Sequence, residues 1–208
     1  MALTPDAFAA DCHVSRETLA RLARYAELLV KWQRSINLVA ADSLDDLWRR
    51  HMLDSAQLFR LLPADCRLVD MGSGAGFPGL VLAVMGVKEV HLIESDGRKA
   101  VFLAEAARHS GLEPGVNPII HRMRLEDMPS LRADVVTARA CARLDQLLAY
   151  AEPMLGPDTI CLFLKGAAVE DELTVAAETW RMTLDRLPSA SDPSGTILRI
   201  GQVARARP

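Results

Sequence analysis

The sequence predicts an α/β protein in which a helical segment precedes a mainly parallel sheet that helices cover on both faces. Three observations lead to this prediction: apolar residues recur at helical spacing near the N-terminus, short apolar runs then alternate with helical segments, and a glycine-rich loop follows the first apolar run. We therefore expect residues 1–64, the leader, to form a helical extension packed on the core. Residues 65–208 are expected to form the sheet as a single compact unit.

The leader contains two predicted helices. Apolar residues lie one helical turn apart between residues 15 and 32, and Ser15 can cap this helix because its hydroxyl accepts a backbone N–H. A second amphipathic helix is predicted from about residue 42 to Phe59, before Pro63. Each helix has one apolar face, so both are expected to pack against the rest of the chain.

Beyond the leader, apolar runs of strand length alternate with segments of helical periodicity, which is typical of a parallel sheet. The expected strands are 68–71, 90–94, 116 or 119–121, 134–138 and 160–165. The expected helices are 78–85, one through Arg98 and Ala106, 144–154, and 169–180. Segments 181–187 and 196–203 are expected to form a closing antiparallel pair, joined by a loop at 188–195.

The most informative stretch is residues 67–79, Arg-Leu-Val-Asp-Met-Gly-Ser-Gly-Ala-Gly-Phe-Pro-Gly. Gly72, Gly74 and Gly76 allow the backbone to turn sharply and to approach a ligand without a Cβ in the way. Proline suits the first turn of the helix that follows, because its missing N–H is no loss there. The stretch therefore predicts a loop whose backbone N–H groups face a nucleotide-type cofactor.

Two cofactors fit this loop. Residues 74–79 match the G-x-G-x-x-G fingerprint of dinucleotide sites, and Glu94 lies at the spacing of a ribose-binding acid. A pyrophosphate would be repelled by the carboxylate of Asp70, whereas the cationic sulfonium and ammonium of S-adenosylmethionine would be stabilised by it. Asp70 therefore favours S-adenosylmethionine over NAD.

Charged residues follow each of the predicted parallel strands, at the edge where open α/β sheets bind ligands. Glu94 is expected to accept the ribose hydroxyls, or alternatively to cap the next helix. Leu125 and Glu126 are expected to bracket an adenine, although Glu126 suits an exposed loop equally well. Arg139 needs an anionic or carbonyl partner, because burying a guanidinium alone is costly. That partner is either the ligand or a structural acid, for instance Asp70 or Asp134. Lys165 likewise places a cationic side chain at the end of the next apolar strand.

The leader carries polar residues inside its second helix. His51 and Asp54 are three residues apart and therefore share a helix face. They can be a self-satisfied core pair, and Arg49 and Arg50 can be solvated. The alternative is a basic wall beside the cofactor pocket that faces the substrate.

Composition excludes several classes of protein. The chain has 208 residues, 50% of them hydrophobic and 25% charged, which suits a folded domain with a large core. We find no apolar run of membrane-spanning length and no signal peptide, and expect a cytoplasmic protein. The four cysteines are widely separated, so no metal site or disulfide framework is expected. A formal net charge of −3 gives no overall attraction to nucleic acid.

Several motifs, taken in order, resemble those of one family. They are Lys31-Trp32 with Asn37-Leu38, Arg50 to Ser55, Asp70 to Gly79, Ala138-Arg139-Ala140 and Lys165-Gly166. On these motifs the chain resembles the GidB family, also called RsmG, of bacterial 16S ribosomal RNA guanine-N7 methyltransferases. The resemblance implies a class I, Rossmann-like, S-adenosylmethionine-dependent methyltransferase fold with a mainly parallel seven-stranded sheet and a helical N-terminal extension.

The motifs and the resemblance together give the expected site residues. The expected cofactor-binding residues are Asp70, Gly72, Gly74, Gly76, Phe77, Glu94, Leu125, Glu126 and Arg139. The expected substrate-binding residues are Arg50, His51, Asp54, Arg139, Arg143 and Lys165, with Arg139 and Lys165 as the catalytic pair. Thr137 and Cys141 depart from the usual family residues, which implies a roomier acceptor pocket. Glu94 stands where many relatives have Asp, and this longer acid is still expected to reach the ribose hydroxyls.

The chemistry of guanine N7 suits these residues. N7 already presents a lone pair with O6 beside it, so it can attack a methyl group without first losing a proton. The segment after the fourth strand reads Thr-Ala-Arg-Ala, not the Asp/Asn-Pro-Pro-aromatic run typical of amino-group methyltransferases, and Cys141 lacks the proline of a C5 nucleophile. Arg139 and Lys165 are expected to hold O6 or a neighbouring phosphate.

The expected partner is 16S ribosomal RNA, within an assembled small-subunit particle, and the protein is expected to be a monomer with no membrane partner. Two alternatives stay open. One is an NAD-dependent oxidoreductase that uses the glycine loop. The other is a non-catalytic RNA-binding assembly factor that retains a cofactor fold.

Overall fold

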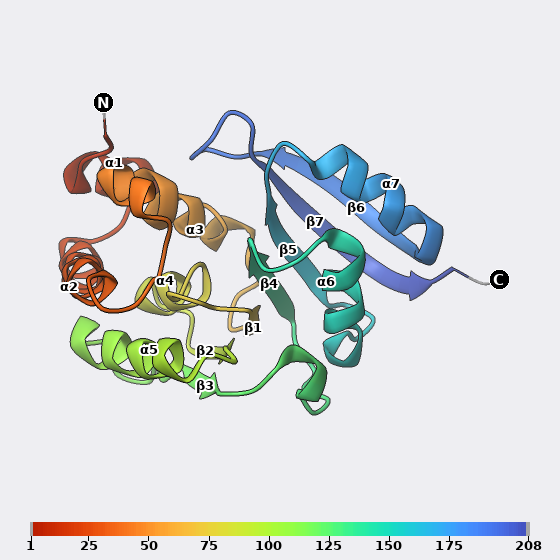
Figure 1. The fold of residues 1–208 in the computed structure, drawn as a ribbon, viewed down its shortest axis with the longest axis horizontal. Coiled ribbons are helices and arrows are strands. Elements are labelled where there is room, and N and C mark those ends of the chain that lie inside the picture. Colours follow the sequence, from red (N-terminus) through yellow and green to blue (C-terminus); the bar gives the residue numbers. More distant parts are fainter. Residues whose placement is uncertain (1, 207–208) are drawn as a thin grey trace.

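A computed structural model describes residues 2–206, which form one seven-stranded sheet of order β3-β2-β1-β4-β5-β7-β6 (Figure 1). The parallel strands are β1 (Arg67–Met71), β2 (Glu89–Ile93), β3 (Ile119–His121), β4 (Val135–Arg139) and β5 (Ile160–Lys165). The antiparallel strands are β6 (Trp180–Pro188) and β7 (Thr196–Arg205). The predicted sheet and closing antiparallel pair are therefore confirmed. The strand order reverses between β1 and β4, which places the ligand-binding edge at their carboxyl ends.

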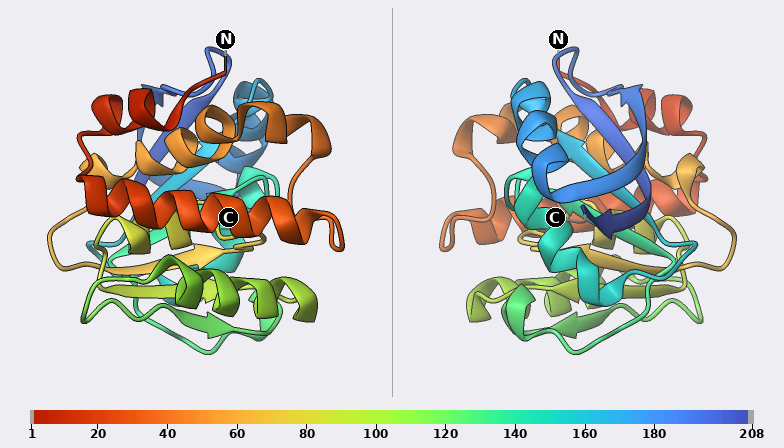
Figure 2. Two further views of the ribbon diagram at one scale, coloured as in Figure 1. Left: turned by 90° about the vertical axis from the view of Figure 1, so that its left-hand side faces the viewer. Right: turned by 90° about the vertical axis from the view of Figure 1, so that its right-hand side faces the viewer.

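Helices cover both faces of this sheet. They are α1 (Pro5–Cys12), α2 (Arg16–Gln33), α3 (Asp54–Ala56), α4 (Gly79–Val84), α5 (Gly97–Ser110), α6 (Leu144–Ala151) and α7 (Val169–Thr179). Figure 1 shows α6 and α7 on one face, while α1 to α5 lie on the other. The two side views in Figure 2 show the same separation. Each face buries its own apolar cluster, one around Phe102 and one around Phe163.

Local chemistry fixes the helix ends. The Ser15 hydroxyl accepts the Thr18 N–H at 3.1 Å, so the predicted cap of α2 is confirmed. Asp96 caps α5 by accepting the N–H groups of Arg98 and Lys99. The short helix α1 was not predicted, because it has too few turns to show a period, yet it buries Phe8 completely.

The predicted continuous helix from residue 42 to Phe59 is wrong in detail. The segment is a 3₁₀ turn (Ala41–Asp46), a π-helical turn (Trp48–Leu53), α3 and a second 3₁₀ turn (Phe59–Leu61). The Asp54 N–H bonds to the carbonyls of Arg49 and His51 rather than to that of Arg50. The Arg50 carbonyl can therefore accept a hydrogen bond from Arg139. A tertiary contact thus accompanies the departure from α-helical geometry.

The leader shares its core with the sheet domain. Leu22 and Leu29 of α2 are fully buried and belong to the apolar cluster that contains Leu80 of α4 and Phe102 of α5. The Tyr25 hydroxyl of α2 donates to the carbonyl of Ala75 in the glycine loop. The loop therefore depends on the leader for part of its packing.

Replacing Leu22 with alanine should lower the free energy of unfolding by about 2–5 kcal/mol, because it leaves a cavity at a fully buried site. Urea unfolding followed by circular dichroism measures this change. Val30 lies on the same helix but is 42% exposed, so Val30→Ala is the matched control and should change stability by less than about 0.5 kcal/mol. Equal effects of the two substitutions would contradict a shared core.

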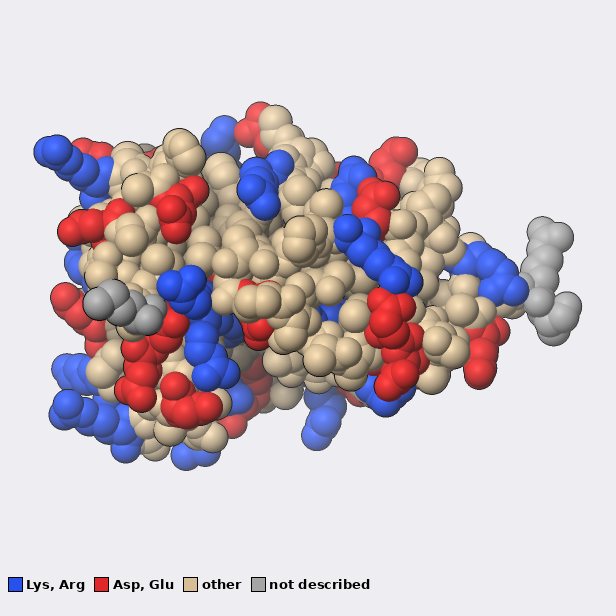
Figure 3. All heavy atoms as spheres, turned by 90° about the horizontal axis from the view of Figure 1, so that it is seen from above, with Lys and Arg blue, Asp and Glu red and all other residues tan. Residues whose placement is uncertain are grey.

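Within residues 2–206, no helix combines the length and apolarity that a membrane span requires. The same residues contain no group of three or more His, Cys, Asp or Glu side chains placed to hold a metal ion. On the face seen from above, positive and negative side chains are interspersed rather than gathered in one basic surface (Figure 3). Any attraction to an anionic partner through this face must therefore come from local groups.

Candidate functional site

A cavity of about 1080 Å³ lies at the carboxyl ends of the parallel strands. Its walls come from the leader, the glycine loop, the segment after β4, the end of β5 and the loop between β6 and β7. The predicted residues that line it are Arg50, His51, Asp54, Gly72, Gly74, Phe77, Glu94, Arg139, Arg143 and Lys165. A second cavity of about 790 Å³, beside Arg60 and β6, contains none of the predicted residues.

Asp70 does not line the cavity, which corrects its prediction as a cofactor contact. Its side chain is fully buried, one carboxylate oxygen accepts the Gly79 N–H at 3.2 Å, and the other accepts the Thr137 hydroxyl at 2.8 Å. Thr137 lies opposite Asp70 in the β1–β4 register. Burial raises the pKa of Asp70 to about 6, against the lowering effect of these hydrogen bonds. Asp70 therefore ties the start of α4 to two strands.

Three more expected cofactor contacts lie outside the cavity. A Cβ on Gly76 would lie 2.5 Å from the Tyr25 hydroxyl, so this glycine is needed for packing against the leader. Leu125 and Glu126 lie in a 3₁₀ turn after β3, where the Glu126 carboxylate accepts the Tyr150 hydroxyl at 3.0 Å. The sequence places these residues near the ligand edge but does not specify which way they point.

The glycine loop and Glu94 form one hydrogen-bonded unit. Gly72 and Gly74 have φ values of 64° and 56°, in the left-handed region that glycine adopts without strain. The Glu94 carboxylate accepts the Gly74 N–H at 2.8 Å and the Asp96 N–H at 2.7 Å. Glu94 thus supports the start of α5, which is one of the two expectations for it. It also lies at the cavity wall, where its oxygens retain lone pairs, and its contact with ribose hydroxyls stays a prediction.

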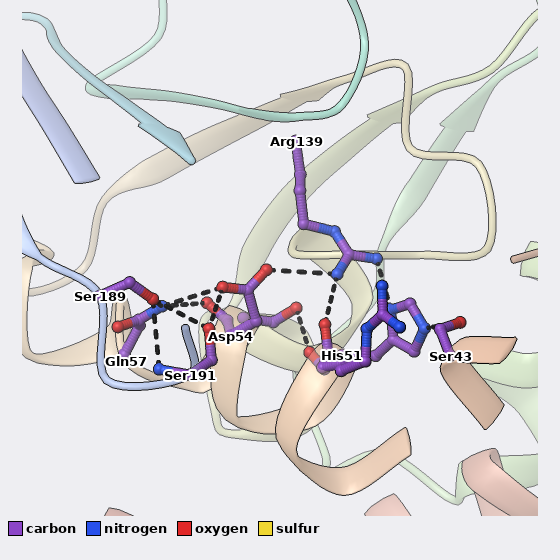
Figure 4. A network of polar contacts seen from close by, with 9 residues as sticks. Ser43, His51, Asp54, Gln57, Arg139, Ser189 and Ser191 are labelled. Atoms are coloured by element: carbon purple, nitrogen blue, oxygen red, sulfur yellow. Dashed lines mark hydrogen bonds and ion pairs between the residues drawn. The ribbon is translucent and has the colours of Figure 1, made fainter. Parts of the chain in front are cut away.

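Arg139 finds its partners in the leader (Figure 4). Its guanidinium donates to the Arg50 carbonyl at 2.9 Å, to Asp54 at 3.2 Å and to His51 Nδ1 at 2.9 Å. It also lies over the Phe77 ring, with its Cζ atom 4.8 Å from the centroid. The expected alternative partners, Asp70 and Asp134, are therefore wrong.

His51 is held as a neutral imidazole. The Ser43 hydroxyl donates to the Ala40 carbonyl, so it must accept from His51 Nε2–H, which lies 2.6 Å away. His51 Nδ1 then carries the lone pair that accepts from Arg139. Burial, together with the charges of Arg139 and Arg50, lowers the pKa of His51 to about 3. Because Arg139 occupies its lone pair, His51 is positioned to orient Arg139 and not to accept a proton.

Asp54 connects the leader to the β6–β7 loop. One carboxylate oxygen pairs with Arg139, and the other accepts the Ser191 hydroxyl at 2.6 Å. Gln57 extends the connection by accepting the Ala190 N–H at 2.8 Å and donating to the Ser189 hydroxyl at 3.1 Å. Figure 4 shows this network running from Ser43 to Ser191. The predicted pairing of His51 with Asp54 is replaced by a shared contact with Arg139.

Lys165 also enters the cavity with a partner. Its ammonium lies 2.5 Å from Glu172 of α7 and donates to the Ala142 carbonyl at 2.9 Å. Glu172 could not be predicted from the sequence, because nothing in its local pattern distinguishes it from the other acids of an exposed helix face. Other residues that line the cavity were not predicted either, among them Ser43, Lys99, Ser189 and Ser191. Arg143 lies at the cavity wall with its side chain 60% exposed.

The fold is shared with several solved structures. Solved structures with the same fold include the ribosomal protein L11 methylase from Lactobacillus delbrueckii subsp. bulgaricus, at 17% identity and a TM-score of 0.59 over 74% of this chain and 77% of that one. They also include M. jannaschii TYW2 in complex with AdoMet, at 17% identity and a TM-score of 0.54 over 83% and 80%. The fold is that of class I S-adenosylmethionine-dependent methyltransferases.

Closer relatives specify the family. The GidB family, described as rRNA small subunit methyltransferase G, matches residues 18–192. The ribosomal RNA small subunit methyltransferase G of Rhodospirillum rubrum is 56% identical over 98% of this chain and all of its own length. That of Paramagnetospirillum magneticum is 57% identical over 93% of each chain. The chain belongs to the GidB family, and its cofactor is S-adenosyl-L-methionine.

The residues present fit that cofactor. A Cβ on Gly74 would have only the Gly72 carbonyl within 4 Å, so the loop leaves open space where a side chain would intrude. Glu94 offers acceptors for ribose hydroxyls at the same wall. When bound, the cofactor supplies a methyl group on a positively charged sulfur. The NAD-dependent alternative is wrong, and both tyrosines lie elsewhere: Tyr25 is fully buried on Ala75, and Tyr150 is bonded to Glu126.

Proposed function

We propose that this protein transfers a methyl group from S-adenosyl-L-methionine to N7 of one guanine in 16S ribosomal RNA. The relatives of the GidB family carry the small-subunit RNA in their name. The observation that carries the proposal is the pair of cationic side chains, Arg139 and Lys165, fixed at the cavity wall by acceptors from other elements. A methyl transfer to N7 requires positioning of the base, not removal of a proton.

Arg139 retains donors for the substrate or the cofactor. A guanidinium has five N–H groups, and three are used by Arg50, Asp54 and His51. The Nε–H and one Nη2–H are left, and they form one edge of the planar group. Such an edge suits two oxygens of a carboxylate or a phosphate, so Arg139 can hold either the cofactor or the RNA backbone.

The direct experiment maps N7-methylguanine in small-subunit RNA from cells with and without this protein. We expect one site to lose its methyl group in the deletion strain and to regain it when the wild-type protein is restored. A non-catalytic assembly factor would instead leave the methylation pattern unchanged, and purified wild-type protein would then incorporate no methyl group into small subunits from the deletion strain.

We further propose that the substrate is the assembled small-subunit particle and that the protein acts on it as a monomer in the cytoplasm. The net charge of −3 and the interspersed charges of Figure 3 support a weak affinity for RNA alone. The largest exposed apolar side chains are distributed over separate elements: Val30, Phe59, Val101, Ile119 and Val175. The proposed cytoplasmic location follows from the proposed substrate, the small-subunit particle.

Binding to a naked fragment of 16S RNA should therefore be weak at physiological salt, with a dissociation constant no tighter than about 1 μM. Fluorescence anisotropy with a labelled fragment and with intact small subunits measures both affinities under one condition. We expect the particle to bind at least about tenfold more tightly. Equal affinities would contradict the assembled particle as the preferred substrate.

A further inference from the structure

Lys165 and Glu172 expose one donor and one acceptor side by side. The Oε2 atom of Glu172 accepts both contacts given to this carboxylate, the Leu144 N–H at 2.8 Å and the Lys165 ammonium at 2.5 Å. No residue in the described part of the chain bonds to its Oε1 atom. The Lys165 ammonium has three N–H groups, of which Glu172 and the Ala142 carbonyl take two. Both side chains line the cavity, at 8% and 14% exposure.

We propose that this pair reads the identity of the methylated base, an inference that rests on the proposed function. Guanine carries the O6 acceptor next to the N1–H donor, and this order is the complement of a Lys165 N–H beside a Glu172 oxygen. Adenine carries a donor at position 6 and an acceptor at N1, so both contacts would be mismatched. Lys165 therefore donates to O6, and Glu172 accepts from N1–H.

These contacts leave the reacting atom accessible. O6 lies between N1 and N7 on the edge of the base, so hydrogen bonds at O6 and N1 do not occupy the N7 lone pair. That lone pair forms the new N–C bond while the methyl–sulfur bond breaks and its electron pair stays on sulfur. No proton moves. The base becomes cationic, which makes N1–H a stronger donor, and the contact with Glu172 therefore tightens as the reaction proceeds.

A purely structural role is the competing explanation. Glu172 accepts the first N–H of α6 and pairs with the last residue of β5, so it also connects α7 to both elements. Under that explanation Glu172 would affect stability but not the choice of base. The experiment must therefore compare bases rather than total activity.

The test uses small subunits reconstituted from ligated RNA that carries guanine, inosine or 2-aminopurine at the mapped position. Inosine keeps O6 and N1–H, whereas 2-aminopurine lacks O6 and has an acceptor at N1. We expect the wild-type protein to methylate inosine within about tenfold of guanine and to reject 2-aminopurine by at least about 100-fold. Equal rates on guanine and 2-aminopurine would overturn the inference without any variant.

The substitution Glu172→Gln should change this ratio. Its carbonyl oxygen can keep the contacts to Leu144 and Lys165, which turns the amide NH₂ toward the cavity and replaces an acceptor with a donor. We expect the guanine-to-2-aminopurine rate ratio to fall at least tenfold while calorimetry shows unchanged cofactor affinity. Glu170→Gln, on the same helix but exposed, is the matched control and should keep the wild-type ratio.

An unchanged guanine-to-2-aminopurine rate ratio in Glu172→Gln would refute the proposal that Lys165 and Glu172 recognise the base. Failure of the proposed function has a different signature, since the wild-type protein would then leave guanine itself unmethylated at every position. If Glu172→Gln does not fold, equal rates of the wild-type protein on guanine and 2-aminopurine would still overturn the inference.

Discussion

Replacing Arg139 with alanine should lower the rate of methyl transfer to small subunits by about 100-fold or more. The guanidinium is fixed by Arg50, Asp54 and His51, so its free edge is positioned before any ligand arrives. Arg139→Lys should recover little of the loss, because an ammonium cannot reproduce a planar fork of donors. Incorporation of labelled methyl groups into subunits from a deletion strain measures the rate.

Arg143→Ala provides the matched control. Arg143 lines the same cavity, but its side chain is 60% exposed and lies 3.9 Å from Asp145, so we expect less than about a tenfold change. Thermal unfolding of each variant separates lost activity from lost structure. An Arg139→Ala protein within threefold of the wild-type rate would contradict the role given to this residue.

Acidification should destabilise the protein through His51. The pKa of His51 is lowered to about 3 in the folded state, whereas an unfolded histidine titrates near 6.5. Between these values the unfolded chain binds more protons, so stability rises with pH in this window and falls as pH drops. Relative to His51→Asn, the wild-type protein should lose about 3 kcal/mol between pH 6.5 and pH 4.

The comparison with His51→Asn is needed because Asp70 acts in the opposite direction. Its folded pKa is raised to about 6, so its contribution to stability falls as pH rises from about 4 to 6. Both proteins contain Asp70, and the difference between them isolates His51. Urea unfolding across this pH range measures the difference. His109→Asn, at an exposed position on α5, is the control, and its free energy of unfolding should change with pH in the same way as that of the wild type. A parallel curve for His51→Asn would show that the imidazole is not buried as a neutral group.

The strands and most helices could be predicted because their patterns are local. Residues 160–165, for example, are an apolar run of strand length bounded by turn residues, and β5 has those bounds. The break in the helix around His51 could not be predicted in this way. It accompanies contacts with Arg139, a residue more than eighty positions away, which no periodicity records.

In the candidate site, too, some features could be predicted from local sequence and others could not. The sequence places Asp70 and Arg139 at the ends of neighbouring strands, and both positions are correct. Side-chain direction is not specified by position, however: Asp70 is completely buried, while Arg139 reaches the cavity. Glu172 is the clearest omission, because it reaches Lys165 only through the packing of α7 against the end of β5.

The bonds from Gln57 and Asp54 to the β6–β7 loop have a consequence for synthesis of the protein. They join residues 132 to 137 positions apart. A nascent chain therefore exposes the leader long before the β6–β7 loop has been synthesised. The cavity can close only after this loop has left the ribosome, so chains that terminate before β6 should depend on chaperones and carry no activity.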